Sequence, residues 1–344
     1  MRAYFDEAVE KLINSEPSST PQEIKDFKLV MEGVAGILET EFAEDLDKIP
    51  AAVILESGDI LDLDNVIIPG GTKSVINYLL EKIPSDVVKI GEKVSNINWS
   101  RDIIEVTTKW GKYTANQVIV TVPLGVLKAD HKNLFTPNLD EKKVKAINNL
   151  AMGCVGTIFL EWDQPWWSGN QVIFTSKLSM NTSISPDDVE FSGWSKEEIE
   201  SQKLPGEWHK SVNSFISEKN TGADNLLWMG ISGDGCRVAD TLPDSEVGQT
   251  AANLLRHFTG DKSIPTPDRV IRNAWSADPN FRGAYSYPSF NTEIGDFTNL
   301  MSPLPTNGRP KVLLAGEHTS LDGLSTMQGG RSSGLEQAQK ILRN

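Results

Sequence analysis

The chain has 344 residues, of which 39% are apolar and 23% charged, and its formal net charge is −14. This is the composition of a globular protein that is long enough to bury a sizeable core. The negative charge argues against a nucleic-acid-binding surface, and no apolar run is long enough to span a bilayer. An acidic surface can concentrate a polycationic molecule, but many soluble proteins are acidic, so charge alone identifies no partner.

The cysteines, the histidines and the first residues bear on disulfides, metal sites and cellular location. Cys154 and Cys236 lie far apart without metal-like spacing, and the four histidines are scattered. We therefore predict neither a disulfide framework nor a metal site. Asp6 and Glu7 stand where a signal peptide would have its apolar core. We expect a cytoplasmic protein, and no partner protein can be deduced.

Apolar residues at helical spacing dominate residues 1–48. The first series shares one helix face and consists of Phe5, Val9, Leu12 and Ile13. After a break at residues 15–21, a second series keeps the same spacing with Ile24, Phe27, Val30, Val34, Ile37, Leu38 and Phe42. We predict a helical arm that packs on another part of the molecule.

Short strands and one helix are predicted for the residues from about 60 to 128. Thr72 is expected to cap a helix whose apolar stripe contains Val75, Tyr78, Leu79 and Ile83. Strands are predicted at residues 87–90, 94–99, 103–107 and 117–122, with a hairpin turn at 109–112 and a stop at Pro123.

The middle of the chain mixes both kinds of element. Helices are predicted after residues 135–139, where Val144, Ile147 and Leu150 follow helical spacing, and at residues 246–258. Strands are predicted at residues 152–162, 172–174, 226–231 and 269–275.

The last strand, turn and helix have an unusual composition. Residues 312–315 are a short apolar run of the kind that a parallel sheet buries, and Glu317 follows in the turn. Ser325 or Thr326 caps a helix with Leu335, Ala338 and Leu342 at helical spacing. The first helical turn is mostly glycine and serine, which suggests that something approaches the backbone closely. A helix N-terminus also favours an electron-rich group, although an ordinary strand-loop-helix crossover fits the spacing equally well.

This C-terminal stretch resembles the flavin-binding signature of the flavin-dependent amine oxidases, above all spermine oxidase and its polyamine oxidase relatives. Residues 121–128, 152–162 and the aromatic stretch 275–287 follow the same family pattern. The resemblance implies that Glu317 contacts the flavin cofactor. It also implies that the helix start at Thr326 and Met327 lies against the flavin pyrimidine ring.

The resemblance assigns further roles residue by residue. Val94 corresponds to a position whose backbone meets the adenine end of FAD. Trp275 would lie against the flavin, and Tyr285 and Thr326 would form facing walls of the substrate site. Thr157 stands where the family carries a lysine that holds the N5 edge of the flavin through a water. A threonine brings no positive charge there.

One family element is missing from this sequence. A flavin amine oxidase opens with a strand, a G-x-G-x-x-G turn and a helix that bind the pyrophosphate. The nearest glycine cluster, at residues 230–235, has the wrong spacing and is not expected to open a helix. We predict weak or absent FAD binding by the chain as given.

Together these expectations give an α/β (α+β) fold with a partial FAD-binding domain of the glutathione-reductase-like kind interleaved with a mixed-sheet substrate domain. The FAD-binding domain comprises residues 60–128 and 276–344, and the substrate domain comprises 1–59 and 129–275. The implied activity is FAD-dependent oxidation of a polyamine by dioxygen to aldehyde, amine and hydrogen peroxide. The alternative is a truncated, weakly active or inactive relative that serves as a binding or scaffold module. A serine hydrolase is discarded, because the one G-x-S-x-G match, at residues 330–334, lies within the predicted C-terminal helix and does not form a strand-to-helix elbow.

Overall fold

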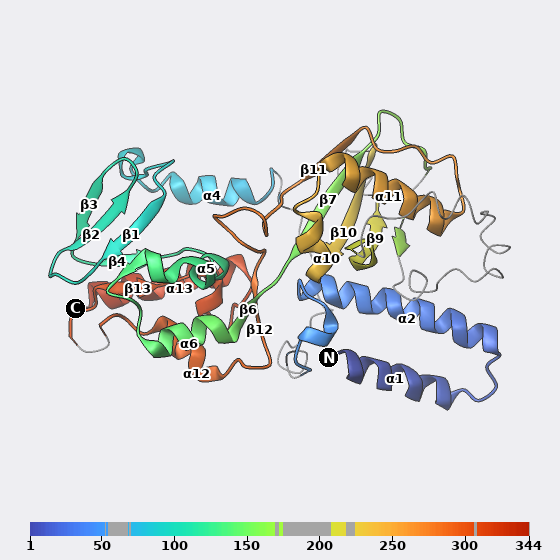
Figure 1. The fold of residues 1–344 in the computed structure, drawn as a ribbon, viewed down its shortest axis with the longest axis horizontal. Helices are drawn as coiled ribbons and strands as arrows, with labels where there is room; N and C mark the ends of the chain where they lie inside the picture. The colour runs from blue at the N-terminus through green and yellow to red at the C-terminus, as the bar shows by residue number, and fades with distance from the viewer. Residues whose placement is uncertain are drawn as a thin grey trace.

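The computed structural model describes residues 1–51, 53, 68, 70–168, 172–174, 208–217, 224–305 and 308–343. They form two lobes that lie side by side (Figure 1). We name these the five-stranded lobe and the four-stranded lobe after the larger sheet in each. The combination of helices and sheets confirms the predicted α/β (α+β) class. The expected domain boundary between residues 59 and 60 falls outside the described residues.

The five-stranded lobe is built on a sheet in which every described pairing is antiparallel, in the order β11-β7-β10-β9-β8. Its strands are β7 (Val155–Glu161), β8 (Val172–Phe174), β9 (Val212–Ile216), β10 (Leu226–Ser232) and β11 (Arg269–Arg272). One face packs in a common core with two helices, α10 (Gly233–Ala239) and α11 (Asp244–Thr259). Side chains alternate along β7, so Ile158 and Leu160 enter that core while Thr157 and Phe159 face the other side.

The predicted helical arm forms as α1 (Arg2–Ser15) and α2 (Pro21–Glu41), followed by η1 (Leu46–Lys48). The face that α2 buries is not the predicted one, because Val30, Val34 and Ile37 are exposed. The buried residues of α2 are Glu32, Gly33, Ala35, Gly36 and Glu39. A Cβ atom on Gly36 would lie 2.9 Å from the Cβ of Asn213 in β9. Small residues therefore let α2 approach the sheet more closely than its large apolar residues could.

The four-stranded lobe contains a sheet in the order β3-β2-β1-β5 and a separate parallel pair, β4 and β13. Its strands are β1 (Val94–Asn98), β2 (Ile104–Thr108), β3 (Lys112–Ala115), β4 (Val118–Val120), β5 (Phe135–Thr136) and β13 (Val312–Leu314). Its helices are α4 (Thr72–Leu80), α5 (Leu124–Leu134), α6 (Glu141–Asn149), α12 (Ile294–Met301) and α13 (Met327–Leu342). One apolar core joins most of these elements.

Three predictions for this lobe were wrong. Residues 87–90 form no strand: a 3-10 turn (Ser85–Val87) ends there, and Ile90 is 89% exposed. A strand needs a neighbour for its hydrogen bonds, and no described strand pairs with this segment. Pro123 ends β4 but also begins α5, a helix that the sequence pattern did not predict. Finally, α13 buries Gly329, Ser333 and Gln337, whereas Leu335 and Leu342, whose helical spacing indicated an apolar face, are exposed.

The described chain crosses between the lobes in two places (Figure 1). One crossing leads from β6 (Leu150–Met152) through Gly153 and Cys154 into β7. The other leads from β11 to β12 (Ser286–Pro288), which pairs with β6. The single strand predicted at residues 152–162 is therefore interrupted. A Cβ atom on Gly153 would lie 2.7 Å from the Cβ of Ala43, so the first crossing runs tightly against the end of the arm.

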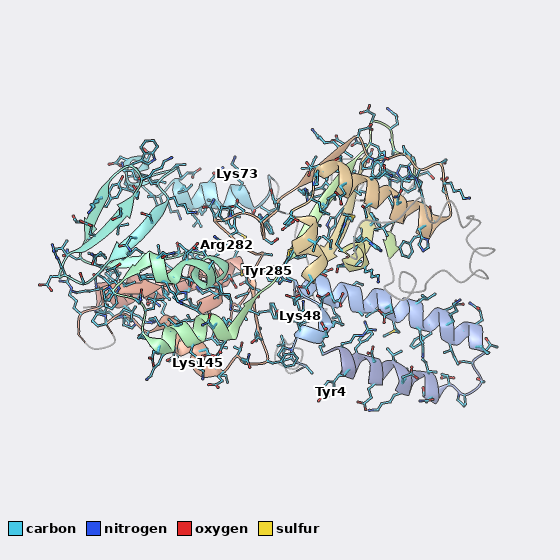
Figure 2. The ribbon with its side chains drawn as sticks, viewed as in Figure 1. Tyr4, Lys48, Lys73, Lys145, Arg282 and Tyr285 are labelled. Carbon is cyan, nitrogen blue, oxygen red and sulfur yellow. A yellow bond between two sulfur atoms is a disulfide. The ribbon has the colours of Figure 1, made fainter. Side chains whose placement is uncertain are left out.

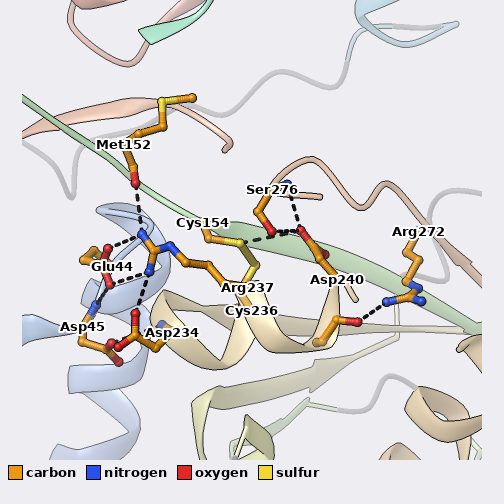
Figure 3. Close-up of a disulfide and its surroundings, with 11 residues drawn as sticks. Glu44, Asp45, Met152, Cys154, Asp234, Cys236, Arg237, Asp240, Arg272 and Ser276 are labelled. Atoms are coloured by element: carbon orange, nitrogen blue, oxygen red, sulfur yellow. Dashed lines mark hydrogen bonds and ion pairs between the residues drawn. A yellow bond between two sulfur atoms is a disulfide. The ribbon is translucent and has the colours of Figure 1, made fainter. Parts of the chain in front are cut away.

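Two predictions about the five-stranded lobe are corrected at the first crossing. Cys154 and Cys236 form a disulfide, with Cα atoms 5.9 Å apart despite a sequence separation of 82 residues (Figure 3). The glycine cluster at residues 230–235 does open a helix, because α10 begins at Gly233. The amide of Gly233 donates to the carbonyl of Cys154 at 2.9 Å. This contact brings the start of α10 to the start of β7, which sequence spacing could not reveal.

Candidate active site

The turn after β13 is organised by the carboxylate of Glu317. This carboxylate accepts hydrogen bonds from the hydroxyl of Ser286 at 2.6 Å and from the amide of Ser325 at 2.9 Å. Burial raises the pKa of the Glu317 carboxyl above its usual value, although these hydrogen bonds oppose the shift. Glu317 thus joins β12 to the turn that leads into α13. Ser325 has a φ of 65°, a left-handed conformation that a non-glycine residue adopts only when its surroundings impose it.

The start of α13 packs against its own preceding turn. The hydroxyl of Thr326 accepts a hydrogen bond from the amide of Gly329 at 3.0 Å. A Cβ atom on Gly329 would lie 1.8 Å from the carbonyl oxygen of Gly323, whereas one on Gly334 would meet nothing within 4 Å. The glycine that is sterically required therefore accommodates the protein's own backbone. Met327 is 51% exposed, so the first helical residue remains open to a ligand.

Two aromatic residues of the predicted site lie on the second crossing. The Trp275 side chain is 39% exposed, and its carbonyl accepts a hydrogen bond from the amide of Gly283. Tyr285 lies between the lobes in Figure 2. Its hydroxyl lies 3.0 Å from the carbonyl oxygens of both Thr40 and Glu41 at the end of α2, and burial raises the pKa of this phenol. The hydroxyl of Tyr285 is therefore engaged by the arm, which leaves the ring face as its available surface.

Thr157 occupies the open face of the five-stranded sheet. It is paired with Gly230 of β10, and Phe159, two residues further along, is paired with Trp228 and with Ile271 of β11. Paired residues share a face, so Phe159, Trp228 and Ile271 form an apolar row beside Thr157. The Thr157 hydroxyl can donate to or accept from a neighbour, but it carries no charge at any physiological pH.

The predicted site residues thus divide into four places. Glu317, Thr326 and Met327 cluster around the start of α13, Trp275 and Tyr285 lie on the second crossing, and Thr157 lies on the five-stranded sheet. Val94 is the first residue of β1, paired with Thr108. Two serines that the sequence did not single out also belong to this region. Ser286 donates to Glu317, and Ser333 bonds to Gly316 beside it, and no spacing rule marks either serine.

The described residues fit one end of a flavin dinucleotide better than the other. Exposed Trp275 and the exposed helix start at Met327 can accept a flat ring. A pyrophosphate, by contrast, needs free amides at a glycine-rich helix start. At the glycine cluster that opens α10, the Asp45 carboxylate accepts from the amide of Asp234 at 3.2 Å, and a Cβ atom on Gly233 would meet Asp45 at 2.7 Å. A carboxylate at that position would repel a phosphate, so this cluster does not fit one.

The sequence model of one protein family, described as "Flavin containing amine oxidoreductase", matches residues 36–342. The chain belongs to this family. This confirms the resemblance that its motifs indicated, and it makes FAD the cofactor to test. In the described part of this flavin-family chain, no helix is long and apolar enough to cross a membrane.

Individual relatives point in the same direction. The chain is 28% identical over 293 residues to a Bos taurus protein named peroxisomal N(1)-acetyl-spermine/spermidine oxidase, a match that covers 80% of this chain and 54% of that protein. It is 27% identical to an Arabidopsis thaliana protein named probable polyamine oxidase 5, covering 82% and 56% respectively. A solved structure of a putrescine oxidase double mutant matches the fold with a TM-score of 0.64 at 16% identity, covering 98% of this chain and 67% of that one. The chain spans about half the length of the curated relatives it matches.

Proposed function

We propose that this chain forms the substrate-binding and flavin-ring-binding portion of a FAD-dependent polyamine oxidase. The observation that carries the proposal is the family match over residues 36–342, together with relatives named as oxidases of acetylated polyamines and polyamines. In the proposed reaction, a C–N bond of spermine or an N-acetylated polyamine is oxidised to an imine, and water hydrolyses the imine to an aldehyde and an amine. Dioxygen takes up two electrons and two protons and becomes hydrogen peroxide.

Within this proposal, the chain's own residues have separate tasks. Trp275 and Tyr285 offer ring faces to the alkyl chain of the substrate and to the flavin. Thr326 caps the helix start that would face the pyrimidine end of the ring, where negative charge is favoured. Glu317 holds that helix start in place through Ser325. Val94 stays a proposed contact of the adenine end.

The substitution at position 157 predicts slow turnover. A hydroxyl there can hold a water, but it cannot supply the titratable amine that the family pattern places beside the ring. A positioned proton-transfer group contributes about 10²–10⁴-fold to a rate. With FAD in excess, we expect Thr157→Lys to raise peroxide production from spermine within this range. Thr157→Ser, which keeps the hydroxyl, serves as the matched control and should change the rate little.

A second candidate function is a non-catalytic binding or scaffold module. Thr157 favours it, and so does the carboxylate of Asp45 at the start of α10. Peroxide assays with saturating FAD separate the two candidates. If no polyamine yields peroxide with either the wild-type chain or Thr157→Lys, the oxidase proposal fails and the scaffold remains. We also keep the expectation of a cytoplasmic location, which fractionation of cells expressing the chain would test.

A further inference from the structure

The second crossing, residues 275–285, touches more separate elements than any other feature of the proposed site. The amide of Ala284 donates to the carbonyl of Gly153 at 2.9 Å, and the amide of Gly153 donates to the carbonyl of Tyr285 at 2.8 Å. Both crossings are thus bonded to each other. A Cβ atom on Gly125 in α5 would lie 2.5 Å from the carbonyl oxygen of Arg282, so α5 lies directly against the segment. Figure 2 shows Arg282 and Tyr285 in this position between the lobes.

The first residues of this segment are held by Asp240, which follows α10. One oxygen of its carboxylate, Oδ2, accepts from the amide of Ser276 at 2.9 Å and from the hydroxyl of Ser276 at 2.6 Å. Figure 3 shows both bonds. Hydrogen bonds to an ionised acceptor are about twice as strong as neutral ones. Since Trp275 directly precedes Ser276, the bond to the Ser276 amide fixes the peptide group that joins Trp275 to Ser276.

Asp240 is itself fixed by the disulfide. Cys236 lies one helical turn before Asp240, and its bond to Cys154 ties α10 to the first crossing. The Sγ atom of Cys154 lies 3.8 Å from Oδ2 of Asp240 (Figure 3). A disulfide sulfur has no proton to donate, so this is a packing contact. The disulfide therefore limits the positions open to the Asp240 carboxylate by packing against it, not by a hydrogen bond.

The strand before Trp275 is anchored to the same end of α10. Arg272, the last residue of β11, donates to the carbonyl oxygens of Ala239 and Leu242 and pairs with Asp244 at 2.7 Å. Only three residues separate Arg272 from Ser276. Trp275 is consequently held between two anchors at the end of α10 and the turn that follows it, although it lies in an irregular segment and its side chain is partly exposed.

We propose that Asp240 is a positioning residue that holds Trp275 at the junction of the two lobes, with the Cys154–Cys236 disulfide holding Asp240. The assignment of Trp275 to a flavin-facing wall rests on the proposed function. The positioning of Trp275 by Asp240 does not, because it follows from the contacts of Ser276 alone. No step of the reaction is assigned to Asp240.

Hydrogen exchange of the full chain tests the proposal, with Asp240→Ala as the main variant. Local opening of residues 275–285 should become about 10- to 100-fold more frequent, because the Ser276 amide loses a charged acceptor. Amides of β10 should keep their wild-type rates. Asp240→Asn retains an oxygen acceptor and should restore part of the protection. Acrylamide quenching of Trp275 fluorescence, isolated by subtracting the spectrum of Trp275→Phe, should increase in Asp240→Ala.

The matched control is Asp261→Ala. Asp261 accepts from the amide of Ser263 at 2.8 Å and from its hydroxyl at 2.6 Å, which is the same bonding arrangement within one exposed loop. Its removal should leave residues 275–285 unchanged. Replacing both cysteines by serine should accelerate exchange in residues 275–285 in the same direction as Asp240→Ala, since the support of Asp240 is lost.

Two results would overturn the proposal. One is unchanged exchange and quenching at residues 275–285 in Asp240→Ala. The other is an equal acceleration in β10, which would mean that Asp240 supports the whole lobe and does not position the crossing. Neither readout requires bound flavin or turnover. If the chain oxidises no polyamine but shows the expected exchange pattern, the proposed function is wrong and the positioning role of Asp240 stands.

Discussion

Helix α11 of the five-stranded lobe and helices α4 and α13 of the four-stranded lobe differ in how they use apolar residues. Helix α11 buries apolar side chains such as Val247, Leu254 and Leu255 against the sheet. No residue of α4 is buried, and α13 exposes its leucines while burying Gly329, Ser333 and Gln337. Helical periodicity therefore identified both kinds of helix, but it identified the packed face in α11 and not in α2 or α13.

This contrast teaches that the helices of this chain do not share one level of stability. Apolar area removed from water is the main source of folding free energy, and the exposed helices of the four-stranded lobe contribute little of it. Opening free energies within one protein range from near zero to the global value, and helices with few buried apolar residues lie at the low end. We expect α4 and the end of α13 to exchange amide protons faster than β10.

The largest expected effect compares one leucine in each lobe. Leu227→Ala removes a fully buried side chain from the core of the five-stranded lobe and should lower the free energy of unfolding by about 2–5 kcal/mol. Leu335→Ala in α13 removes a side chain that is 47% exposed, and it should change the free energy by about 0.5 kcal/mol or less. Urea denaturation of both variants checks this. Similar losses in the two would mean that Leu335 is as well packed as Leu227 and would contradict the contrast between α13 and the core of the five-stranded lobe.

One contribution to the pH dependence of stability should come from His318 in the four-stranded lobe. Burial lowers the pKa of the His318 imidazole to about 4, and in the described structure its Nε2 atom has no hydrogen-bond partner. As the pH falls, the imidazole of His318 therefore binds a proton near pH 6.5 in the unfolded chain but only near pH 4 in the folded chain. Stability is retained above pH 6.5 and falls by roughly 3 kcal/mol as the pH drops to 4.

Denaturation of the wild-type chain and of His318→Phe at pH 7 and pH 5 measures this contribution. The difference between the two proteins isolates His318 from Glu317, whose raised pKa acts in the opposite direction over the acidic range. A wild-type chain that loses no more stability than His318→Phe between these values would show that the imidazole is not desolvated as described.

The smallest expected effect separates two glycines of α13. Gly329→Ala places a methyl group within 1.8 Å of the Gly323 carbonyl and should cost about 1–3 kcal/mol. Gly334→Ala meets no atom within 4 Å and should stabilise the helix by about 1 kcal/mol, because alanine favours the helix over glycine. Thermal unfolding of the two variants gives the signs. Equal signs would contradict the packing of the helix start on its own turn.

Sequence reasoning recovered most elements and the family. It identified β1, β2 and α11 within about two residues of their ends, because their apolar periodicity matches the faces they bury. It missed the disulfide, because the pairing of Cys154 with Cys236 depends on α10 returning to the start of β7. It also missed Asp240, since the carboxylate acts on a serine 36 residues away and no local pattern links the two.

The sequence identified candidate site residues, but it did not predict which residues they contact. The resemblance named Glu317 as a flavin contact, and it did not predict that the Glu317 carboxylate accepts hydrogen bonds from Ser286 and Ser325. The glycines at the helix start suggested a close ligand, yet the closest neighbour of Gly329 is Gly323. Such contacts depend on the positive φ of Ser325 and on tertiary packing, and neither has a signature in composition or spacing.

The central claim is that this flavin-family chain retains the ring end of the cofactor site, while its given sequence contains no G-x-G-x-x-G turn to bind the pyrophosphate. Parallel titrations of the chain with FAD and with riboflavin, followed by the quenching of flavin fluorescence, test it most directly. The account predicts weak binding with dissociation constants within about tenfold of each other, since the nucleotide half of FAD would add only the proposed backbone contact of Val94 with the adenine end. Binding of FAD at least about 100-fold tighter than riboflavin, a difference of about 2.7 kcal/mol, would contradict it.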